Sequence, residues 1–119
     1  MKRGKKLYKK QYLVACYDKQ DEINCLQKTY LRLKTDLGEC DLKASRHSMK
    51  IIGKNIEILF RSRNQLFGYE LLFYGVAKTT KFDRLANDSE RNEWEMQRMR
   101  TKSVYGANDC DGVMRMYVR

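Results

Sequence analysis

The stretch Tyr12-Leu-Val-Ala-Cys-Tyr17, near the start of the chain, decides the fold class. It is mostly apolar and rich in residues that favour β-structure, which predicts a central strand. The next residues, Asp18–Glu22, are polar and turn-like. Two interpretations then remain open. Either Ile23–Leu26 is a short second strand that completes a hairpin, or one long helix runs from Gln20 to Leu37.

The pattern after the first strand supports a helix in both interpretations, because Lys28–Leu37 is helical in each. Gly38 follows this segment and is suited to a helix C-cap. Asp41 is suited to cap a second helix that ends near Ile52. The apolar residues that fall on one face of the long helix are Ile23, Leu26, Tyr30, Leu33 and Leu37.

The second half of the chain contains further strands and one more helix. Ile56–Arg61 alternates between apolar and polar side chains, as a half-buried strand does, and Leu66–Val76 is the expected returning strand of a hairpin. Residues 78–87 are polar and poorly periodic. A third helix follows, capped by Asp88 or Ser89 and ending near Lys102, and Val113–Val118 is a closing strand.

These elements predict an α+β fold with a small antiparallel sheet and about three packed helices. The chain has 119 residues, of which 42% are hydrophobic and 34% charged, which is sufficient for one modest core. We expect residues 1–11 to form a flexible basic tail and residues 12–119 to form a single compact domain.

The two predicted helices around Gly38 are the feature most specific for function. Their spacing fits a helix-turn-helix motif, in which the second helix presents polar residues to a DNA groove. An ordinary helical hairpin with a solvated basic face fits the same pattern. In the first interpretation the predicted hairpin is a wing, and the nucleic-acid-binding residues are Lys43, Arg46, His47 and Lys50 on the helix and Arg61 and Arg63 at the hairpin turn.

The charge of the chain favours a polyanionic partner. The formal net charge is +10, and it is concentrated in the N-terminal tail and in the middle of the sequence. Basic arms add electrostatic affinity for nucleic acid without sequence preference, although a disordered end without a specific role has the same composition. The tail residues that we assign to phosphate contact are Lys5, Lys6, Lys9 and Lys10.

Two runs of sequence resemble a group of mobile-element proteins. Tyr12–Glu22, followed by Tyr30–Gly38, is similar to small accessory proteins of Gram-positive phages and integrated elements. Those proteins often open with a short Leu-Val-Ala-x-Tyr-Asp hairpin and continue into a helix-turn-helix-like segment. The resemblance covers about residues 12–49. It implies a phage or mobile-element origin, and the group includes DNA-associated factors and inhibitors of host defence.

Enzymatic and metal-binding functions are not supported by any motif. The sequence has no glycine-rich phosphate loop, and its four cysteines include no Cys-x-x-Cys pair. We therefore expect a non-enzymatic protein without a metal or another cofactor. No apolar run is long enough for a membrane span, so a soluble protein of the host-cell cytoplasm is expected.

The sequence thus predicts a nucleic-acid-directed binding protein of a phage or mobile element. The alternative is a phage-encoded stoichiometric inhibitor of a host defence nucleoprotein, such as a CRISPR effector, which acts by protein–protein or protein–RNA contact. In that case a docking surface is expected around Trp94, Phe67 and Met96, since aromatic and methionine side chains suit protein contacts.

Overall fold

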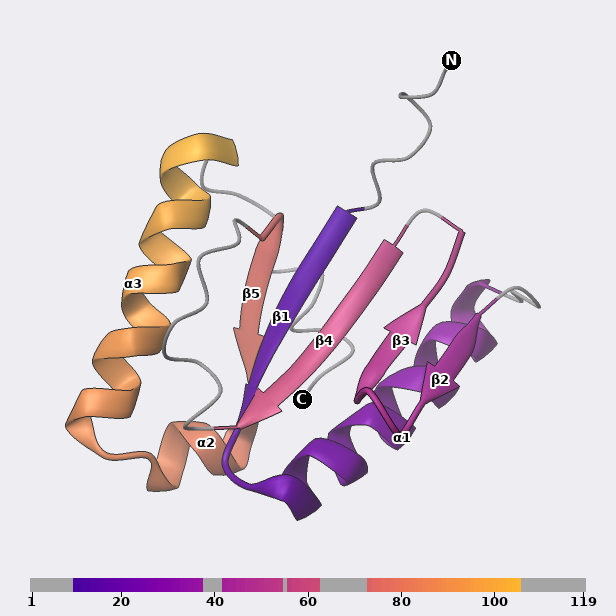
Figure 1. Cartoon of the computed structure of the whole chain (residues 1–119), viewed down its shortest axis with the longest axis horizontal. Coiled ribbons are helices and arrows are strands. Elements are labelled where there is room, and N and C mark those ends of the chain that lie inside the picture. Colours follow the sequence, from indigo (N-terminus) through magenta and orange to yellow (C-terminus); the bar gives the residue numbers. More distant parts are fainter. Residues whose placement is uncertain (1–9, 38–41, 55, 63–72, 106–119) are drawn as a thin grey trace.

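The computed structural model describes residues 10–37, 42–54, 56–62 and 73–105. It has an α+β fold in which one mixed sheet lies between helices (Figure 1). The strand order across the sheet is β2-β3-β4-β1-β5. The strands are β1 (Lys10–Cys16), β2 (Lys43–Ser45), β3 (Lys50–Ile52), β4 (Ile56–Ser62) and β5 (Gly75–Lys78), and the helices are α1 (Lys19–Leu37), α2 (Thr80–Leu85) and α3 (Asp88–Tyr105).

The predicted first strand is confirmed as β1, at the centre of the parallel part of the sheet. All five residues from Tyr12 to Cys16 are buried, because α1 covers one face and α2 and α3 cover the other. The expectation of an antiparallel sheet is wrong for this strand, since β1 pairs in parallel with both β4 and β5. β1 also begins at Lys10, so Lys10 and Gln11 belong to the sheet rather than to the predicted tail.

The long-helix interpretation is correct for the segment after β1, and the hairpin with Ile23–Leu26 is wrong. Helix α1 begins at Lys19 because Asp18 caps it: the Asp21 backbone N–H donates to Asp18 Oδ1 at 2.9 Å. Leu26 and Leu33 are buried against the sheet, as the apolar periodicity predicts.

The predicted helix from Asp41 to Ile52 is wrong, and so is the helix-turn-helix that depends on it. The described part of this segment is an antiparallel hairpin of β2 and β3, and β3 pairs with β4. Ile51 is fully buried and packs with Ile58 of β4, so tertiary burial outweighs the weak helical periodicity.

The turn of the β2–β3 hairpin is held by a serine of the turn itself and by Arg61 of β4. Ser48 N–H donates to Ser45 Oγ at 3.2 Å, and Met49 adopts a left-handed conformation with φ of 51°. The Arg61 guanidinium donates to the carbonyls of Ser48 at 3.2 Å and Met49 at 3.1 Å. Met49 is 5% exposed, so its burial offsets the backbone strain that a non-glycine residue has in this region.

The predicted hairpin between Ile56–Arg61 and Leu66–Val76 is also wrong. The first of these strands is present as β4, but β5 begins at Gly75 and pairs only with β1 among the described residues. Most of the predicted returning strand, and the predicted closing strand Val113–Val118, lie outside the described residues. Placing the apolar residues of β5 beside β1 buries Val76 and Ala77.

The third predicted helix is confirmed as α3, and α2 precedes it in the polar segment that shows little periodicity. Thr79 caps α2 by accepting a hydrogen bond from Phe82 N–H, and Phe82 is buried. Asn87, rather than Asp88 or Ser89, caps α3: Asn87 and Glu90 exchange two hydrogen bonds of 2.9 Å between side chain and backbone.

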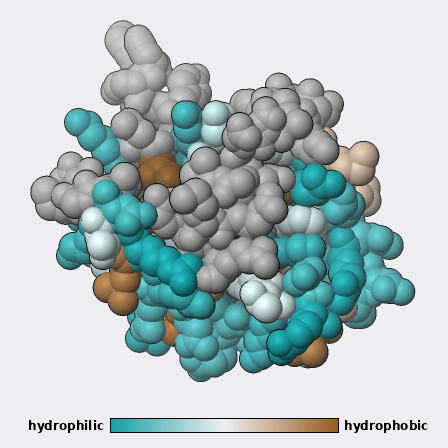
Figure 2. Space-filling view, turned by 180° about the vertical axis from the view of Figure 1, so that it is seen from behind, coloured by the Kyte–Doolittle hydropathy of each residue, from teal (hydrophilic) through white to brown (hydrophobic). Residues whose placement is uncertain are grey.

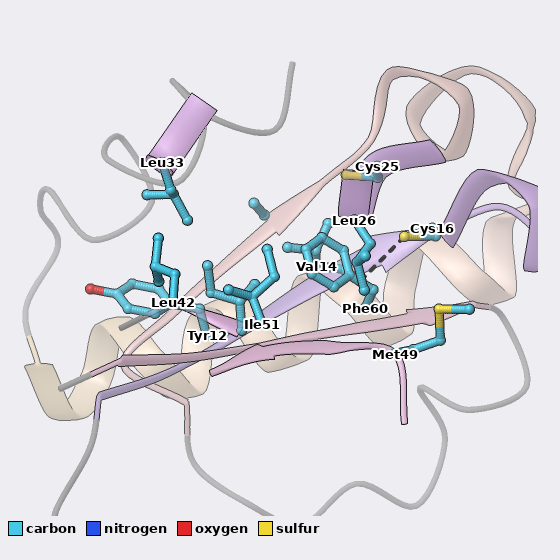
Figure 3. Packing of buried hydrophobic residues seen from close by; sticks show 12 residues of the cluster. Tyr12, Val14, Cys16, Cys25, Leu26, Leu33, Leu42, Met49, Ile51 and Phe60 are labelled. Atoms are coloured by element: carbon cyan, nitrogen blue, oxygen red, sulfur yellow. Dashed lines mark hydrogen bonds between the residues drawn. The ribbon is translucent and has the colours of Figure 1, made fainter. Parts of the chain in front are cut away.

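The core has two parts, one on each face of the sheet. Between α1 and the sheet, Leu26 and Cys25 of α1 lie over Val14 and Phe60 (Figure 3). On the opposite face, Leu13 and Leu59 pack with residues of α2 and α3 that include Phe82 and Trp94. Helices therefore pack on both faces of the sheet, α1 on one face and α2 with α3 on the other.

Candidate functional site

The carboxyl ends of the three parallel strands meet at one edge of the sheet, which we call the carboxyl edge (Figure 1). The chain leaves β1 for α1 on one face and leaves β5 for α2 on the opposite face. Such a divergence between neighbouring strands opens a crevice in which open α/β sheets commonly bind ligands. The β2–β3 turn lies at the same edge, since Met49 O accepts from Phe60 N–H near the end of β4.

A buried hydrogen-bond network fixes the two helices at this edge. Asp21 of α1 accepts from Thr79 Oγ1 at 2.6 Å and from the Tyr17 backbone N–H at 2.8 Å, both through Oδ2. Thr79 N–H donates to Ala15 O at 3.0 Å, which continues the β1–β5 pairing. The start of α1 is thereby held against the end of β5.

The N-terminus of α1 is not suited to bind a phosphate group. Only Tyr17 and Asp18 connect β1 to α1, so no glycine-rich loop is present there. The carboxylates of Asp18 and Asp21 accept the hydrogen bonds of nearby backbone N–H groups. An anion at this point meets two acidic side chains instead of open donors.

A pocket between α1 and α2 has a different charge. We call it the α1–α2 pocket; its volume is about 290 Å³. Three basic side chains line it, and Asp21 is its one acidic residue among those described. Lys28 and Arg84 are exposed, and Lys81 is half-buried with its ammonium 5.8 Å from the centre of the Tyr17 ring. The lining residues are Asp21, Asn24, Cys25, Lys28, Thr79, Thr80, Lys81 and Arg84.

A second hollow of about 310 Å³ lies on the other side of α1, next to β2. It is mainly apolar and includes Tyr30, Leu31 and Ala44, and Arg46 contributes its one charged lining residue among those described. Leu31 is 63% exposed. Basic side chains therefore lie on both sides of the exposed ridge of α1.

The described residues on the side opposite to the view of Figure 1 are mainly hydrophilic. Figure 2 shows the hydrophobic residues of the described surface in small, separate patches. Large contiguous apolar patches are typical of permanent protein interfaces. The described residues that are visible in Figure 2 therefore form no large apolar patch.

The nucleic-acid-binding residues predicted on the second helix do not share a helix. Lys43 is exposed in β2, and Arg46 and His47 are exposed in the β2–β3 turn. Lys50 of β3 is half-buried, and its ammonium lies 3.1 Å from Glu57 Oε2. Lys50 is thus engaged within the sheet, while the other three face solvent.

None of the remaining predicted nucleic-acid contacts that the structure describes lines the α1–α2 pocket. Arg61 holds the carbonyls of the β2–β3 turn, which makes it a structural residue. Lys10 lies at the opposite edge of the sheet, 4.7 Å from the centre of the Tyr74 ring. The others lie outside the described residues: Lys5, Lys6, Lys9 and Arg63.

The residues predicted for protein docking do not form one surface. Trp94 is 9% exposed, and its indole N–H donates to Ala77 O at 3.0 Å. The ammonium of Lys78 lies over the indole ring, 4.4 Å from its centre. Met96 of the same helix is 62% exposed, and Phe67 lies outside the described residues. Trp94 is accordingly a core residue.

Two free cysteines are buried near the α1–α2 pocket: Cys25 lines it, and Cys16 does not. Burial raises the pKa of the Cys16 thiol well above its usual value. Hydrogen bonding from Cys16 lowers the pKa of Cys25, and Cys25 also lies 3.7 Å from Thr29 Oγ1. No cluster of three or more His, Cys, Asp or Glu side chains that could hold a metal occurs in the described ranges.

One buried polar atom at the start of α1 lacks a hydrogen bond. Glu22 is 1% exposed, and its Oε1 accepts no hydrogen bond from any residue that the structure describes. Lys19 Nζ is 3.8 Å from this oxygen, which is too far for a hydrogen bond. Glu22 does not line the α1–α2 pocket.

Comparison of the chain with protein-family models, with curated proteins and with solved structures gives no match. Among the described helices, none combines the length and the apolar character that crossing a membrane requires.

The pocket residues Lys28, Lys81 and Arg84 were not predicted as site residues from the sequence. They come from two segments far apart in the chain, and only the pairing of β1 with β5 brings these segments together. The Thr79 cap three residues before the buried Phe82 was a usable signal for α2. No local pattern, however, indicates that β1 and β5 are neighbours.

Proposed function

We propose that this protein binds nucleic acid without catalysing a reaction, through basic side chains on both sides of α1. We define the cationic face as Lys28, Lys81, Arg84 and Arg46. The observation that carries the proposal is the α1–α2 pocket, where three basic residues gather with one carboxylate. The exposed His47 lies next to Arg46 and extends the polar part of this face.

The acidic residues near the pocket are engaged by neighbours. Asp21 accepts two hydrogen bonds through one carboxylate oxygen, and Asp83 of α2 lies 2.7 Å from the Lys78 ammonium. Such pairing reduces the extent to which these carboxylates neutralise the basic residues of the pocket. A concentrated positive field of this kind attracts phosphate groups, and the net charge of +10 adds to it over a longer range.

The proposed contact is with the phosphate backbone rather than with base edges. Reading a DNA groove requires an element that enters it. α1 packs along the sheet, and the predicted recognition helix is replaced by the short strands β2 and β3. We therefore propose binding with little sequence preference, in which basic residues on the two flanks of α1 hold a strand that crosses its ridge.

The resemblance to phage accessory proteins gives this proposal a biological setting. It supports a protein that acts on nucleic acid in the cytoplasm of an infected host cell. The alternative, inhibition of a host defence nucleoprotein, is favoured by a separate observation: Leu31 is 63% exposed beside an apolar hollow, which suits a protein contact.

Charge reversal at the cationic face tests the proposal. Fluorescence anisotropy with an internally labelled single strand would compare the natural chain with a Lys28→Glu, Arg84→Glu variant. Both residues are exposed, so the fold is expected to persist. We expect affinity to fall by about a hundredfold, since two attractive contacts become repulsive.

A control that also reverses a single charge, for comparison with Lys28→Glu alone, is available at the opposite edge of the sheet. Lys54 is exposed just before β4, whose first residue pairs with the first residue of β1. A Lys54→Glu variant should lose only the small, general electrostatic contribution. Equal losses in both variants would contradict a localised interface. If neither variant changes affinity but Leu31→Ser abolishes binding to a defence nucleoprotein, the alternative function is correct.

A further inference from the structure

The α1–α2 pocket has the charge of a site for a doubly charged anion. Three basic residues and Asp21 leave it with a formal charge of about +2. A phosphomonoester carries about −1.5 to −2 near neutral pH, whereas each phosphodiester of a nucleic-acid backbone carries a single negative charge. The charge of the pocket therefore matches a terminal phosphate better than an internal one.

The polar groups of the pocket suit the same ligand. Arg84 offers a planar guanidinium, which binds two phosphate oxygens at once, and Lys28 and Lys81 add point charges. Asn24 and Thr80 contribute neutral donors at the rim. A terminal phosphate has three free oxygens to receive these donors, whereas a diester has two.

The size and position of the pocket also favour the end of a strand. Its volume of about 290 Å³ is at the small end of the range for ligand pockets, enough for a phosphate and part of its sugar. It is bounded on one side by the sheet edge, where Thr79 bonds to Asp21. A terminal phosphate is joined to the strand on one side only, so it fits a recess that is closed on one side. An internal phosphodiester continues in both directions and needs an exit.

We propose that the α1–α2 pocket binds a terminal phosphomonoester of a nucleic-acid strand. This inference rests on the proposed function, because it takes the remainder of the strand to lie across α1 toward Arg46. The phosphate comes from a 5′ end or a 3′ end of the strand, which share the same chemistry and are separated by experiment.

The test uses the full chain and short single strands of identical sequence with an internal label. One strand has a 5′-phosphate, one a 3′-phosphate and one only hydroxyl ends; unlabelled mononucleotide is added as a competitor. We expect one phosphorylated strand to bind about tenfold more tightly than the hydroxyl strand, because the added charge forms charge-assisted hydrogen bonds. Displacement by mononucleotide at a concentration similar to that of the strand would overturn the inference, because the pocket would then bind a free nucleotide rather than a strand end.

Two variants locate the effect. Lys28→Gln with Arg84→Gln should reduce the phosphate preference to about onefold, whereas Arg46→Gln should weaken all strands and keep the preference. Equal binding of the three strands, with affinity still dependent on the cationic face, would overturn this inference and leave the proposed function standing. If none of the strands binds, both are wrong.

Discussion

Trp94 shows how a single side chain joins α3 to the sheet. Its indole N–H donates to Ala77 O of β5, and its ring packs in the core with Leu13 and Phe82. The ammonium of Lys78 lies over the ring at 4.4 Å, an arrangement that adds a cation–π attraction. These contacts assign Trp94 to stability rather than to partner docking.

Replacing Trp94 with Phe should therefore destabilise the protein. Phe keeps most of the apolar contact but leaves Ala77 O without its donor, so we expect the free energy of unfolding to fall by about 1–3 kcal/mol. Urea denaturation followed by circular dichroism measures this change. Met96→Ala on the exposed side of the same helix is the control, with an expected change of about 0.5 kcal/mol or less. Equal stability of the Phe variant and the natural chain would contradict the structural role.

At the scale of elements, the carboxyl edge is organised by Thr79. Its hydroxyl donates to Asp21 of α1 and accepts from Phe82 N–H of α2, so one side chain connects two helices at the end of β5. Because the α1–α2 pocket is lined by residues of both helices, its shape depends on this connection.

A Thr79→Val substitution tests how much the hydrogen bonds of the Thr79 hydroxyl contribute to stability, because Val has nearly the same shape. Val keeps the volume but loses the cap of α2 and the bond to Asp21, so we expect the free energy of unfolding to fall by about 1–3 kcal/mol. Thr79→Ser keeps the hydroxyl and is the matched control. Amide hydrogen exchange at Phe82 should accelerate in the Val variant alone. If Val and Ser behave alike, Thr79 does not hold the helices together.

The elements also show how far local sequence determines this fold. β1 and α3 were predicted because each has a strong local pattern: continuous apolar residues in Tyr12–Tyr17, and acidic residues before basic ones in the helix that follows Asn87. The segment from Asp41 to Ile52 is predicted as a helix because Leu42, Met49 and Ile52 share a helical face, but in the structure Leu42 and Met49 are buried beneath α1. The parallel pairing of β1 with β5 has no local signal at all, and the α1–α2 pocket depends on it.

At the scale of the whole molecule, the two edges of the sheet differ in their chemistry. The amino ends of the parallel strands carry Lys10, which lies over Tyr74, and the exposed Lys54 nearby. The carboxyl edge carries the α1–α2 pocket and the Arg46 turn. In the proposed function, nucleic acid binds at this second edge, and Lys5, Lys6 and Lys9 add a non-specific electrostatic contribution.

The most direct test is the salt dependence of strand binding by the natural chain and by a variant with Lys5, Lys6 and Lys9 changed to Gln. Anisotropy would be measured from about 50 to 200 mM salt. With a strand that has only hydroxyl ends, each of the four residues of the cationic face can neutralise one internal phosphate. The variant should then still bind, with a slope of log affinity against log salt of about −3. Loss of all binding in this variant would contradict the proposed function, since the cationic face would then have no role in holding nucleic acid.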